Sequence, residues 1–363
     1  METLAFSDLI IDKTKDGTKL PTNDYQKIGS TAIIDQGQEF IAGYTDRSEG
    51  IFTDVPVIIF GDHTRVFKYI DFPFFLGADG VKILKANREV NYRYLYYYFL
   101  QAKFPNTGYA RHFKWLKELQ IPLPPLAEQK HITAILDKTQ KIIAEHKQML
   151  QKYDTLIKSR FIEMFGDIKE KEMIGVNAKL QGGYAFKSKD LTKEGVRLVQ
   201  IGNVNKDNLT WDDIVYVPHS FLEKYSDYKL NEGDVVLAMT RPIIKSLNEV
   251  KIATVGKQDT NSLLNQRVGK FVLLNNKLNM CYLLYCCKTE EFKLYVEKMS
   301  GNSLQPNISS KQVEDYKIPV PPIELQQQFA AFVQQIDKSK FAVQKSLEKA
   351  ETLYKSLMQQ YFA

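Results

Sequence analysis

The side chains that could carry out chemistry in this sequence are few and scattered. A catalytic or metal-binding centre needs titratable groups at defined spacing. His131 and His146 fall on one predicted helix but not on adjacent turns, so they do not form a metal-binding pair. The polar run at 62–65 follows an apolar run typical of a buried strand, and we interpret it as a binding loop. We predict no catalytic or metal-binding role for any of the five histidines: His63, His112, His131, His146 and His219.

Motifs for group transfer and for cofactor binding are also missing from the sequence. The two proline pairs are flanked by Leu, Val and Ile, whereas methylation of a base amino group uses a Pro-Pro pair between Asn or Asp and an aromatic residue. The run Gln181-Gly182-Gly183-Tyr184 is a turn rather than a phosphate cradle, and no ATP-binding loop of the GxxxxGK[ST] type is present. We therefore predict a binding protein without catalytic residues, cofactor or metal.

Composition limits the class of protein further. The 363 residues carry a net charge of +6, which permits a polyanionic partner without requiring one. The three cysteines (Cys281, Cys286 and Cys287) are clustered and contain no CxxC motif, which is typical of reduced thiols in the cytoplasm. Apolar runs are too short to span a bilayer, and the first residues lack the pattern of a signal peptide. We expect a cytoplasmic protein of two or three domains.

A repeat organises the chain. The run Ile121-Pro122-Leu123-Pro124-Pro125-Leu126 recurs at 318–323, and the segments 121–165 and 318–362 share 14 identical residues of 45. Proline restricts both itself and the preceding residue, so each Pro-Pro run should be an extended connector. The repeat predicts four segments: a mixed region at 1–120, a Pro-Pro linker and helix at 121–166, a second mixed region at 167–317 and a second linker and helix at 318–363.

Each repeat continues into a long helical pattern. Apolar residues recur every seven positions between about Ala127 and Phe165, and at steps of three and four between about Glu324 and Tyr361. Only Lys340 breaks the second series. Each helix would be on the order of 55 Å long at 1.5 Å per residue. We predict that the two helices pack antiparallel as a coiled coil; the alternative is that each packs on its own globular region.

The mixed regions are related to each other as well. A strand-then-helix pattern at 80–97 recurs at 268–285, a smaller offset than that between the Pro-Pro runs. The second copy therefore has additional residues before its Pro-Pro run, nine in all, which we place in the loop around Ser300–Gln305. The opening at 1–27 has no visible match in the second region.

Short apolar runs at 55–60 and 234–238 indicate buried strands in both mixed regions. Neither region shows a regular alternation of strands and helices. The prediction is an α+β fold of two globular domains separated by two long helices, with pseudo-two-fold symmetry.

These residues resemble the specificity subunit of type I restriction-modification systems over essentially the whole chain. The resemblance is most specific at 108–120 leading into IPLPPLAEQKHITAILDK, at LIKSRFIEMFGD (156–167) and at GNSLQPNISSKQVEDYKIPVPP (301–322). It implies two target-recognition domains, each binding one half of a bipartite site in double-stranded DNA. The helices would separate the domains and hold two methyltransferase subunits, and translocase-nuclease (restriction) subunits would complete the complex. No membrane partner is implied.

Candidate DNA contacts follow from side-chain chemistry in predicted loops. Lys and Arg contact phosphates, while Arg, Lys, Asn and Gln can also read base edges. In the first region the candidates are Tyr44, Arg47, His63, Arg65, Lys68, Arg111 and Lys114. In the second region they are Tyr184, Lys187, Lys189, Arg241, Lys245, Gln266, Arg267, Asn302 and Gln305. The alternative for each is a solvated surface side chain. The Tyr-rich run at 92–98 is interpreted as helix packing within the domain.

Apolar residues near the helix ends are the candidate partner contacts. They are Phe161, Met164, Phe165, Met358, Tyr361 and Phe362. We predict that they anchor partner subunits or cap the coil; the alternative is that they pack against the neighbouring recognition domain. Two rival functions also remain at this point: a complete methyltransferase or nuclease, which the missing motifs oppose, and a scaffold built on a helical dimer that does not bind DNA.

Overall fold

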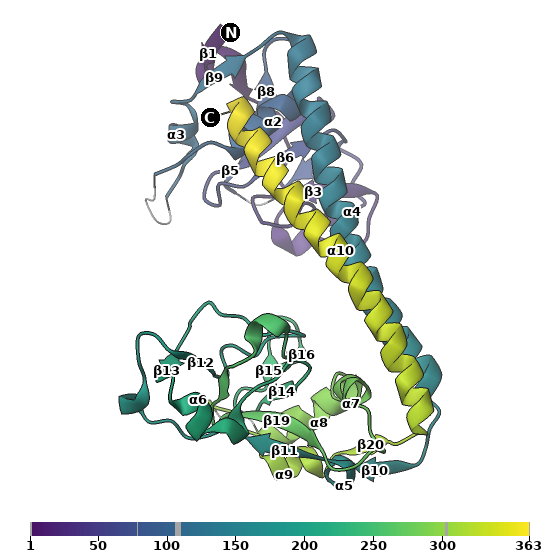
Figure 1. Cartoon of the computed structure of the whole chain (residues 1–363). Helices are drawn as coiled ribbons and strands as arrows, with labels where there is room; N and C mark the ends of the chain where they lie inside the picture. Colours follow the sequence, from purple (N-terminus) through teal and green to yellow (C-terminus); the bar gives the residue numbers. More distant parts are fainter. Residues whose placement is uncertain (1, 78, 106–109, 302–303, 363) are drawn as a thin grey trace. The chain divides into compact units, whose positions relative to one another are not determined.

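The computed structural model describes residues 2–77, 79–105, 110–301 and 304–362, which form two compact units (Figure 1). The first unit comprises residues 1–150 and 342–363, and the second comprises residues 151–341. Helices α4 (Leu126–Phe165) and α10 (Ile323–Phe362) contribute residues to both units. Both helices begin and end within one residue of the predicted bounds. Within the described residues, no helix combines the length and apolar character needed to cross a membrane.

The first unit is a mixed α+β domain with a four-stranded sheet of order β2-β8-β5-β6. A second sheet has the order β4-β3-β7, with β3 and β7 parallel, and β1 pairs with β9. Its elements before α4 are β1 (Glu2–Ala5), α1 (Phe6–Leu9), β2 (Ile10–Asp12), β3 (Thr31–Ile34), β4 (Gly43–Thr45), β5 (Val57–Gly61), β6 (Phe67–Ile70), β7 (Phe74–Leu76), β8 (Val81–Ala86), α2 (Tyr92–Leu100), α3 (Phe113–Leu116) and β9 (Gln120–Leu123).

The second unit has the same sheet orders. Its four-stranded sheet runs β11-β19-β14-β17, its three-stranded sheet runs β13-β12-β18 with β12 and β18 parallel, and β10 pairs with β20. The elements are β10 (Lys171–Met173), α5 (Ile174–Asn177), β11 (Ala178–Gly182), β12 (Val196–Val199), β13 (Tyr216–Val217), α6 (Phe221–Lys224), β14 (Val235–Ala238), β15 (Ile243–Ile244), β16 (Glu249–Val250), β17 (Ile252–Thr254), β18 (Leu263–Leu264), β19 (Val268–Leu273), α7 (Met280–Cys286), α8 (Glu290–Ser300), α9 (Ser310–Glu314) and β20 (Lys317–Pro319).

The matching topologies confirm the duplication and extend it to the opening of the chain. Strand β1, helix α1 and strand β2 correspond to β10, α5 and β11, although their sequences do not visibly match. The backbone N–H of Phe6 donates to Leu119, and that of Ile174 donates to Tyr316. The two acceptors, Leu119 and Tyr316, stand at the same position relative to their Pro-Pro runs. The two openings are therefore equivalent in structure, which the sequence comparison missed.

The apolar runs at 55–60 and 234–238 form buried strands, as predicted. Every residue of β5 and of β14 is buried, as continuous apolar strands inside a layered domain should be. The Tyr-rich run forms α2, whose Tyr94 and Tyr97 are buried in the domain core. The interpretation of this run as helix packing is confirmed.

The additional residues of the second unit lie earlier in the chain than predicted. They form helix α8, which begins after the capping residue Thr289 and buries Phe292 and Val296 one turn apart. The expectation of a longer loop around Ser300–Gln305 is wrong, because this apolar pair allows the extra residues to pack as a helix on the core.

A buried glutamine connects each domain to the start of its long helix. Gln129 accepts a hydrogen bond from the backbone N–H of Asn91 (2.9 Å) and donates to the carbonyl of Pro124 (2.7 Å). Gln326 makes the same two bonds, with Asn279 (2.9 Å) and Pro321 (2.8 Å). We call Gln129 and Gln326 the junction glutamines. They satisfy backbone groups that the Pro-Pro turn would otherwise leave buried without partners.

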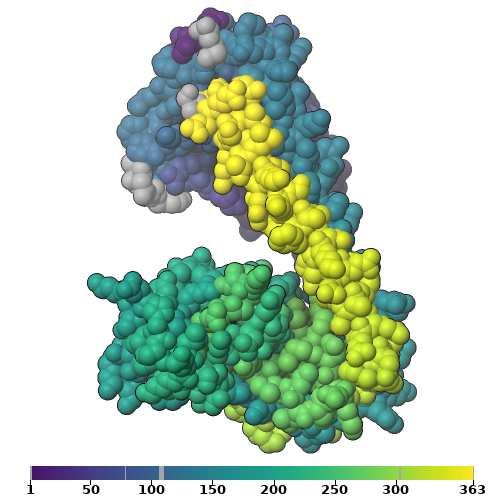
Figure 2. All heavy atoms as spheres, in the orientation of Figure 1, coloured from purple at the N-terminus to yellow at the C-terminus, as the bar shows by residue number. Residues whose placement is uncertain are grey.

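The long helices are antiparallel within each unit. In the first unit, Gln140 pairs with Tyr354 (2.9 Å) and Lys147 with Glu351 (3.0 Å), so residues later in α4 meet residues earlier in α10. Figure 2 shows the C-terminal part of α10 lying against the first unit. In the second unit, Lys340 pairs with Asp154 (2.6 Å), and the Phe161 ring lies 5.4 Å from that of Phe329. The lysine that interrupts the apolar series is thus paired across the coil.

Candidate nucleic-acid interface

Three loops of the second unit meet around one cleft. They follow β14, connect β18 to β19, and precede α9. The backbone N–H of Arg241 donates to Pro306 (2.8 Å), and that of Ile308 donates to Met239 (2.8 Å), which holds the first and third loops together. The cleft is lined by Met239, Thr240, Gln266, Arg267, Asn307, Ile308, Ser309 and Ser310.

Two predicted residues present polar groups in this cleft. Gln266 and Arg267 are both exposed, and the Arg267 guanidinium donates to the Thr240 hydroxyl (3.2 Å). Asn307 lies beside it, with its side-chain oxygen 3.5 Å from the same guanidinium nitrogen. An amide, a guanidinium and a hydroxyl at one opening are the groups that hydrogen-bond base edges and phosphates.

Other predicted residues of the second unit border this cleft or lie elsewhere. Tyr184 lies beside it, because its carbonyl accepts from the backbone N–H of Gln266 (3.0 Å). Gln305 is exposed in the third loop. Lys187 and Lys189 are exposed at a separate short helical turn, and Lys245 is exposed between β15 and β16. The predicted residue Asn302 lies outside the described residues.

The first unit brings together two corresponding loops. The segment after β5 is joined to the segment before α3 by Asp62, whose carbonyl accepts from the backbone N–H of His112 (2.9 Å) and whose carboxylate accepts from that of Phe113 (2.7 Å). This linkage gathers four of the predicted residues: His63, Arg65, Arg111 and Lys114. The last three are exposed, and His63 is half-buried.

The remaining predicted residues of the first unit are outside this group. Tyr44 is half-buried on β4, and Arg47 is exposed just beyond it. Lys68 is only 3% exposed; its ammonium donates to the carbonyl of Glu39 and lies 3.5 Å from the Asp35 carboxylate. Burial lowers the pKa of Lys68 although Asp35 opposes that shift. Its burial leaves this ammonium no surface for DNA, so Lys68 acts within the domain.

The apolar residues at the helix ends pack inside their own units. Phe165 and Met358 are each 2% exposed, and the Phe362 ring lies 5.3 Å from that of Tyr94. Phe161, Met164 and Tyr361 are partly buried against the same cores. Because Phe165 and Met358 are buried, they have no surface for a partner subunit. They pack against the neighbouring domain, which was the alternative interpretation.

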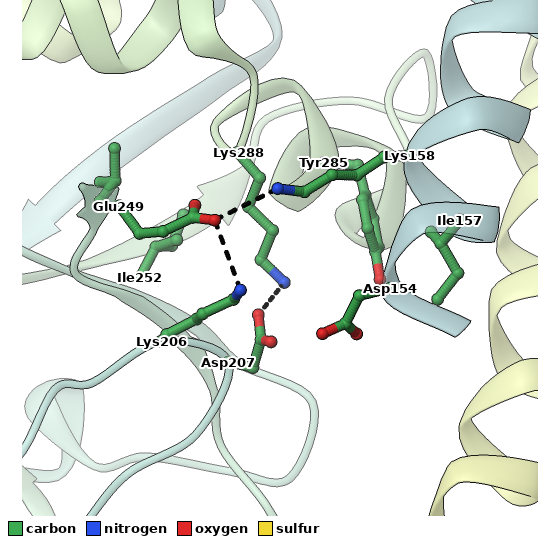
Figure 3. A pocket seen from close by; sticks show the side chains of 10 residues that line it. Asp154, Ile157, Lys158, Lys206, Asp207, Glu249, Ile252, Tyr285 and Lys288 are labelled. Carbon is green, nitrogen blue, oxygen red and sulfur yellow. Dashed lines mark hydrogen bonds and ion pairs between the residues drawn. The ribbon is translucent and has the colours of Figure 1, made fainter. Parts of the chain in front are cut away.

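A second pocket in the second unit is lined by charged side chains, which Figure 3 shows together with Tyr285 and Ile157. Glu249 is paired with Lys158 (3.2 Å) and Lys206 (3.4 Å), and Asp207 with Lys288 (2.5 Å). Burial by itself would raise the pKa of Asp207, but Lys288 and Lys340 outweigh it and lower that pKa. Each carboxylate has a lysine partner, so none is poised as a general base. One of these ion pairs, Lys158–Glu249, connects α4 to the domain.

The part of the chain that the structure describes contains no candidate metal-binding site. No group of three His, Cys, Asp or Glu side chains with the geometry of a metal site occurs there. Burial raises the pKa of the Cys286 thiol to about 12, and that of Cys281 to about 11. These thiols are therefore protonated near neutral pH, and protonated thiols are poor nucleophiles.

The sequence analysis missed two residues of the cleft, Thr240 and Asn307. Both are small polar residues whose types alone carry little information, and they meet only because loops far apart in the sequence converge. The sequence does contain a signal for Thr240. The pair Thr64-Arg65 recurs as Thr240-Arg241, in each case shortly after a strand of the central sheet.

Comparison with known proteins identifies relatives over nearly the whole chain. The family described as "Type I restriction modification DNA specificity domain" matches twice, at residues 10–152 and 167–351. The MjaVIII type I restriction enzyme specificity subunit of Methanocaldococcus jannaschii is 29% identical over 319 residues, which is 78% of this chain and 74% of that protein. The EcoR124I/EcoR124II specificity subunit of Escherichia coli is 24% identical over 358 residues, covering 90% and 85%.

A solved structure has the same fold. The type I restriction-modification S subunit of M. genitalium aligns with a TM-score of 0.65 and 16% identity, covering all of this chain and 96% of that one. At this identity the likeness concerns the fold alone.

Proposed function

We propose a function from one premise: the chain belongs to the type I restriction-modification DNA specificity family. On this proposal, it binds a bipartite site in double-stranded DNA, with residues 1–120 contacting one half and residues 167–317 the other. It has no catalytic activity of its own and works in the cytoplasm. The observation that carries the proposal is that both units gather exposed arginines around the loop that follows β5 or β14: Arg65 with Arg111 in one, and Arg241 with Arg267 in the other. Arg65 and Arg241 occupy corresponding loops, whereas Arg111 and Arg267 come from loops that do not correspond.

The chemistry of these loops supports binding rather than catalysis. Guanidinium groups contact phosphates and guanine, and the amide of Gln266 has the donor and acceptor pattern that suits adenine. The carboxylates of the charged pocket are all paired with lysines, which leaves them stabilising the domain. An assay of the purified chain with a methyl donor and target DNA should therefore give no methylation. Methylation by the chain alone would favour the fused-enzyme alternative.

The long helices are proposed to set the distance between the two half-sites and to hold two methyltransferase subunits, with restriction subunits completing the complex. Within both units the helices are bound to each other by polar pairs as well as by apolar residues. Paired helices resist bending better than one helix does, which a spacer needs. The exposed residues on these helices, rather than the buried Phe165 and Met358, are available to partner subunits.

Footprinting on DNA with helix-length variants tests this function. Four residues inserted between Lys147 and Asp154 of α4, and four between Lys340 and Glu351 of α10, retain the ion pairs within each unit. The insertion adds about 6 Å to each helix at 1.5 Å per residue. With DNA rising about 3.4 Å per base pair, we expect the separation of the two protected half-sites to grow by about one or two base pairs.

The matched control places the same four residues between β15 and β16, where no change in separation is expected. A single continuous protected region, or a separation indifferent to helix length, would contradict the spacer role. Absence of any protected region would support the scaffold that does not bind DNA.

A further inference from the structure

The first residues after β5 and β14 can be aligned through the strand pairing, although the loop before β6 is shorter than the loop before β17. Strand β5 pairs with β8 so that Phe60 faces Lys82, and β14 pairs with β19 so that Val236 faces Lys270. Lys82 and Lys270 occupy the same position in the repeated strand-then-helix pattern, so Phe60 corresponds to Val236. Counting the same five steps along the chain from each, Arg65 corresponds to Arg241.

Both arginines have the same unusual backbone conformation. Arg65 has φ +61° and Arg241 has φ +50°, within the left-handed region that residues with a Cβ seldom adopt. Asn and Gly are the usual residues for such a position, because they tolerate it at lower cost. Two copies that share few residues nevertheless both place arginine there. This coincidence indicates that the side chain, and not the turn, is the reason.

The threonine that precedes each arginine anchors its loop, although to a different segment in each unit: Gln36 follows β3, and Asn307 precedes α9. The Thr64 hydroxyl donates to the carbonyl of Gln36 (2.6 Å), and the Thr240 hydroxyl donates to the side-chain oxygen of Asn307. The arginine side chains are exposed, and among the described residues neither forms an ion pair with an acidic side chain. Burial lowers the pKa of Lys251, and the positive charge of nearby Arg241 lowers it further. Each anchored loop thus presents an exposed positive charge that has no acidic partner among the described residues.

We propose that Arg65 and Arg241 are equivalent phosphate contacts, one in each recognition domain, and that neither reads a base. This inference rests on the proposed function. The residues at corresponding positions near the two arginines differ: Met239 stands where the first domain has His63, and Arg267 stands where it has Asp79. Two unlike half-sites share only the phosphodiester backbone, so a contact that is common to both domains should bind that backbone. The side chains that differ between the domains would then read the sequence.

The test measures DNA affinity of the full chain, purified with its methyltransferase subunits, for variants Arg65→Gly and Arg241→Gly. Glycine removes the charge and relieves the left-handed backbone, so folding is retained. Asn261→Gly is the matched control, since Asn261 is exposed with φ +58° but carries no charge. The probes are duplexes containing the mapped recognition site and a set with single base changes in each half.

Each arginine variant should weaken binding to every duplex by a similar factor, roughly eightfold at about 0.1 M salt, and should reduce the slope of log affinity against log salt by about one, as expected for one lost phosphate contact. The double variant should reduce the slope by about two, and Asn261→Gly should leave it unchanged. An unchanged slope, or altered preference at one base position, overturns the inference while leaving sequence-specific binding in place. Failure of the unmodified complex to distinguish any duplex overturns the proposed function as well.

Discussion

The two domains keep the same hydrogen bonds where they join the long helices, and they differ in the side chains beside those bonds. Gln129 and Gln326 bond equivalent backbone groups at nearly equal distances. Two turns further along α4, the first domain has Asp137, which accepts from Arg93 (2.6 Å) and from Tyr97 (2.5 Å).

The corresponding positions of the second domain are occupied by Gln334, Cys281 and Tyr285. Cys281 replaces the arginine in the repeated strand-then-helix pattern, and Gln334 replaces the aspartate in the repeated long helix. Cys281 and Gln334 line a shallow hollow, together with Asp337 and Lys338. The Arg93 ion pair of the first domain thus has no counterpart here.

This difference shows which contacts a duplicated chain can lose. The junction glutamines satisfy buried backbone groups, so replacing either one leaves several groups without partners at once. The Arg93–Asp137 pair is partly exposed, with side chains 38% and 35% accessible, and water can replace it. Backbone-directed contacts therefore persist in both copies, while partly exposed pairs diverge.

The largest effect is expected from Gln129→Ala and Gln326→Ala. Each leaves a half-buried N–H and a buried carbonyl unsatisfied, which should destabilise its own unit by roughly 2–4 kcal/mol. Gln326 also donates to Lys277 (2.9 Å), so its replacement should cost slightly more. Hydrogen exchange measured by mass spectrometry should show faster exchange around β9 in one variant and around β20 in the other. If either variant raised the exchange rate equally in both units, the effect of the junction glutamine would not be confined to its own unit.

A smaller effect, present in one copy only, is expected from Asp137→Ala. It removes hydrogen bonds from Arg93 and Tyr97 to a charged acceptor, and partial exposure reduces the loss to about 1–2 kcal/mol. Gln334→Ala at the equivalent, exposed position is the matched control and should change stability by less than about 0.5 kcal/mol. The free energies come from denaturant unfolding followed by hydrogen exchange in each unit. Equal losses would mean that Gln334 has a role in the second unit comparable to that of Asp137.

The long helices were predictable from sequence because their evidence is local. Heptad spacing and the Pro-Pro connector placed both ends of α4 and α10 to within one residue. The opening of the first domain was not predictable. Its strands β1 and β2 pair through backbone groups with β9 and β8, which lie far along the chain, and such pairing places few demands on side-chain identity.

The candidate site was predictable only in part, for a related reason. Arg241, Gln266 and Arg267 are of types that bind nucleic acids, and the structure brings them to neighbouring loops. Lys68 has the same chemistry but points into the domain toward Asp35, which its position in an apolar strand could have indicated. Convergence of loops depends on bonds between distant segments, such as that from Ile308 to Met239. Sequence spacing does not report those bonds.

The ion pairs of the charged pocket predict that the second unit loses stability as the pH falls. Lysines lower the pKa of Asp207, so this carboxylate stabilises the fold fully above its unfolded pKa of about 4 and loses that contribution as pH falls through its lower folded value. With the side chain 40% exposed, we expect about 1 kcal/mol or less. Compared with the wild type, Asp207→Asn should lower the unfolding free energy at pH 7 and leave it unchanged at about pH 2.

Asp337 has a pKa raised mainly by burial, and its contribution to the pH dependence has the opposite sign. The informative quantity is therefore the difference in unfolding free energy between wild type and Asp207→Asn at each pH. Asp212→Asn, at an exposed position in the same unit, should give a difference near zero throughout. A difference for Asp207→Asn that stays constant from pH 7 to pH 2 would show that the ion pairs do not contribute through charge.

The smallest effect is expected when the polar pair of the first domain is transferred to the second. Cys281→Arg combined with Gln334→Asp recreates the arginine and aspartate beside Tyr285, and the hollow that these positions line provides room for the longer side chain. The two changes should favour each other by about 0.5 kcal/mol, the usual coupling of a partly exposed ion pair, in a double-mutant cycle of unfolding free energies. Because Asp337 lies in the same hollow, Cys281→Arg alone should gain part of this stabilisation. Zero coupling would mean that the two domains differ there in backbone position, and not only in which residues occupy equivalent sites.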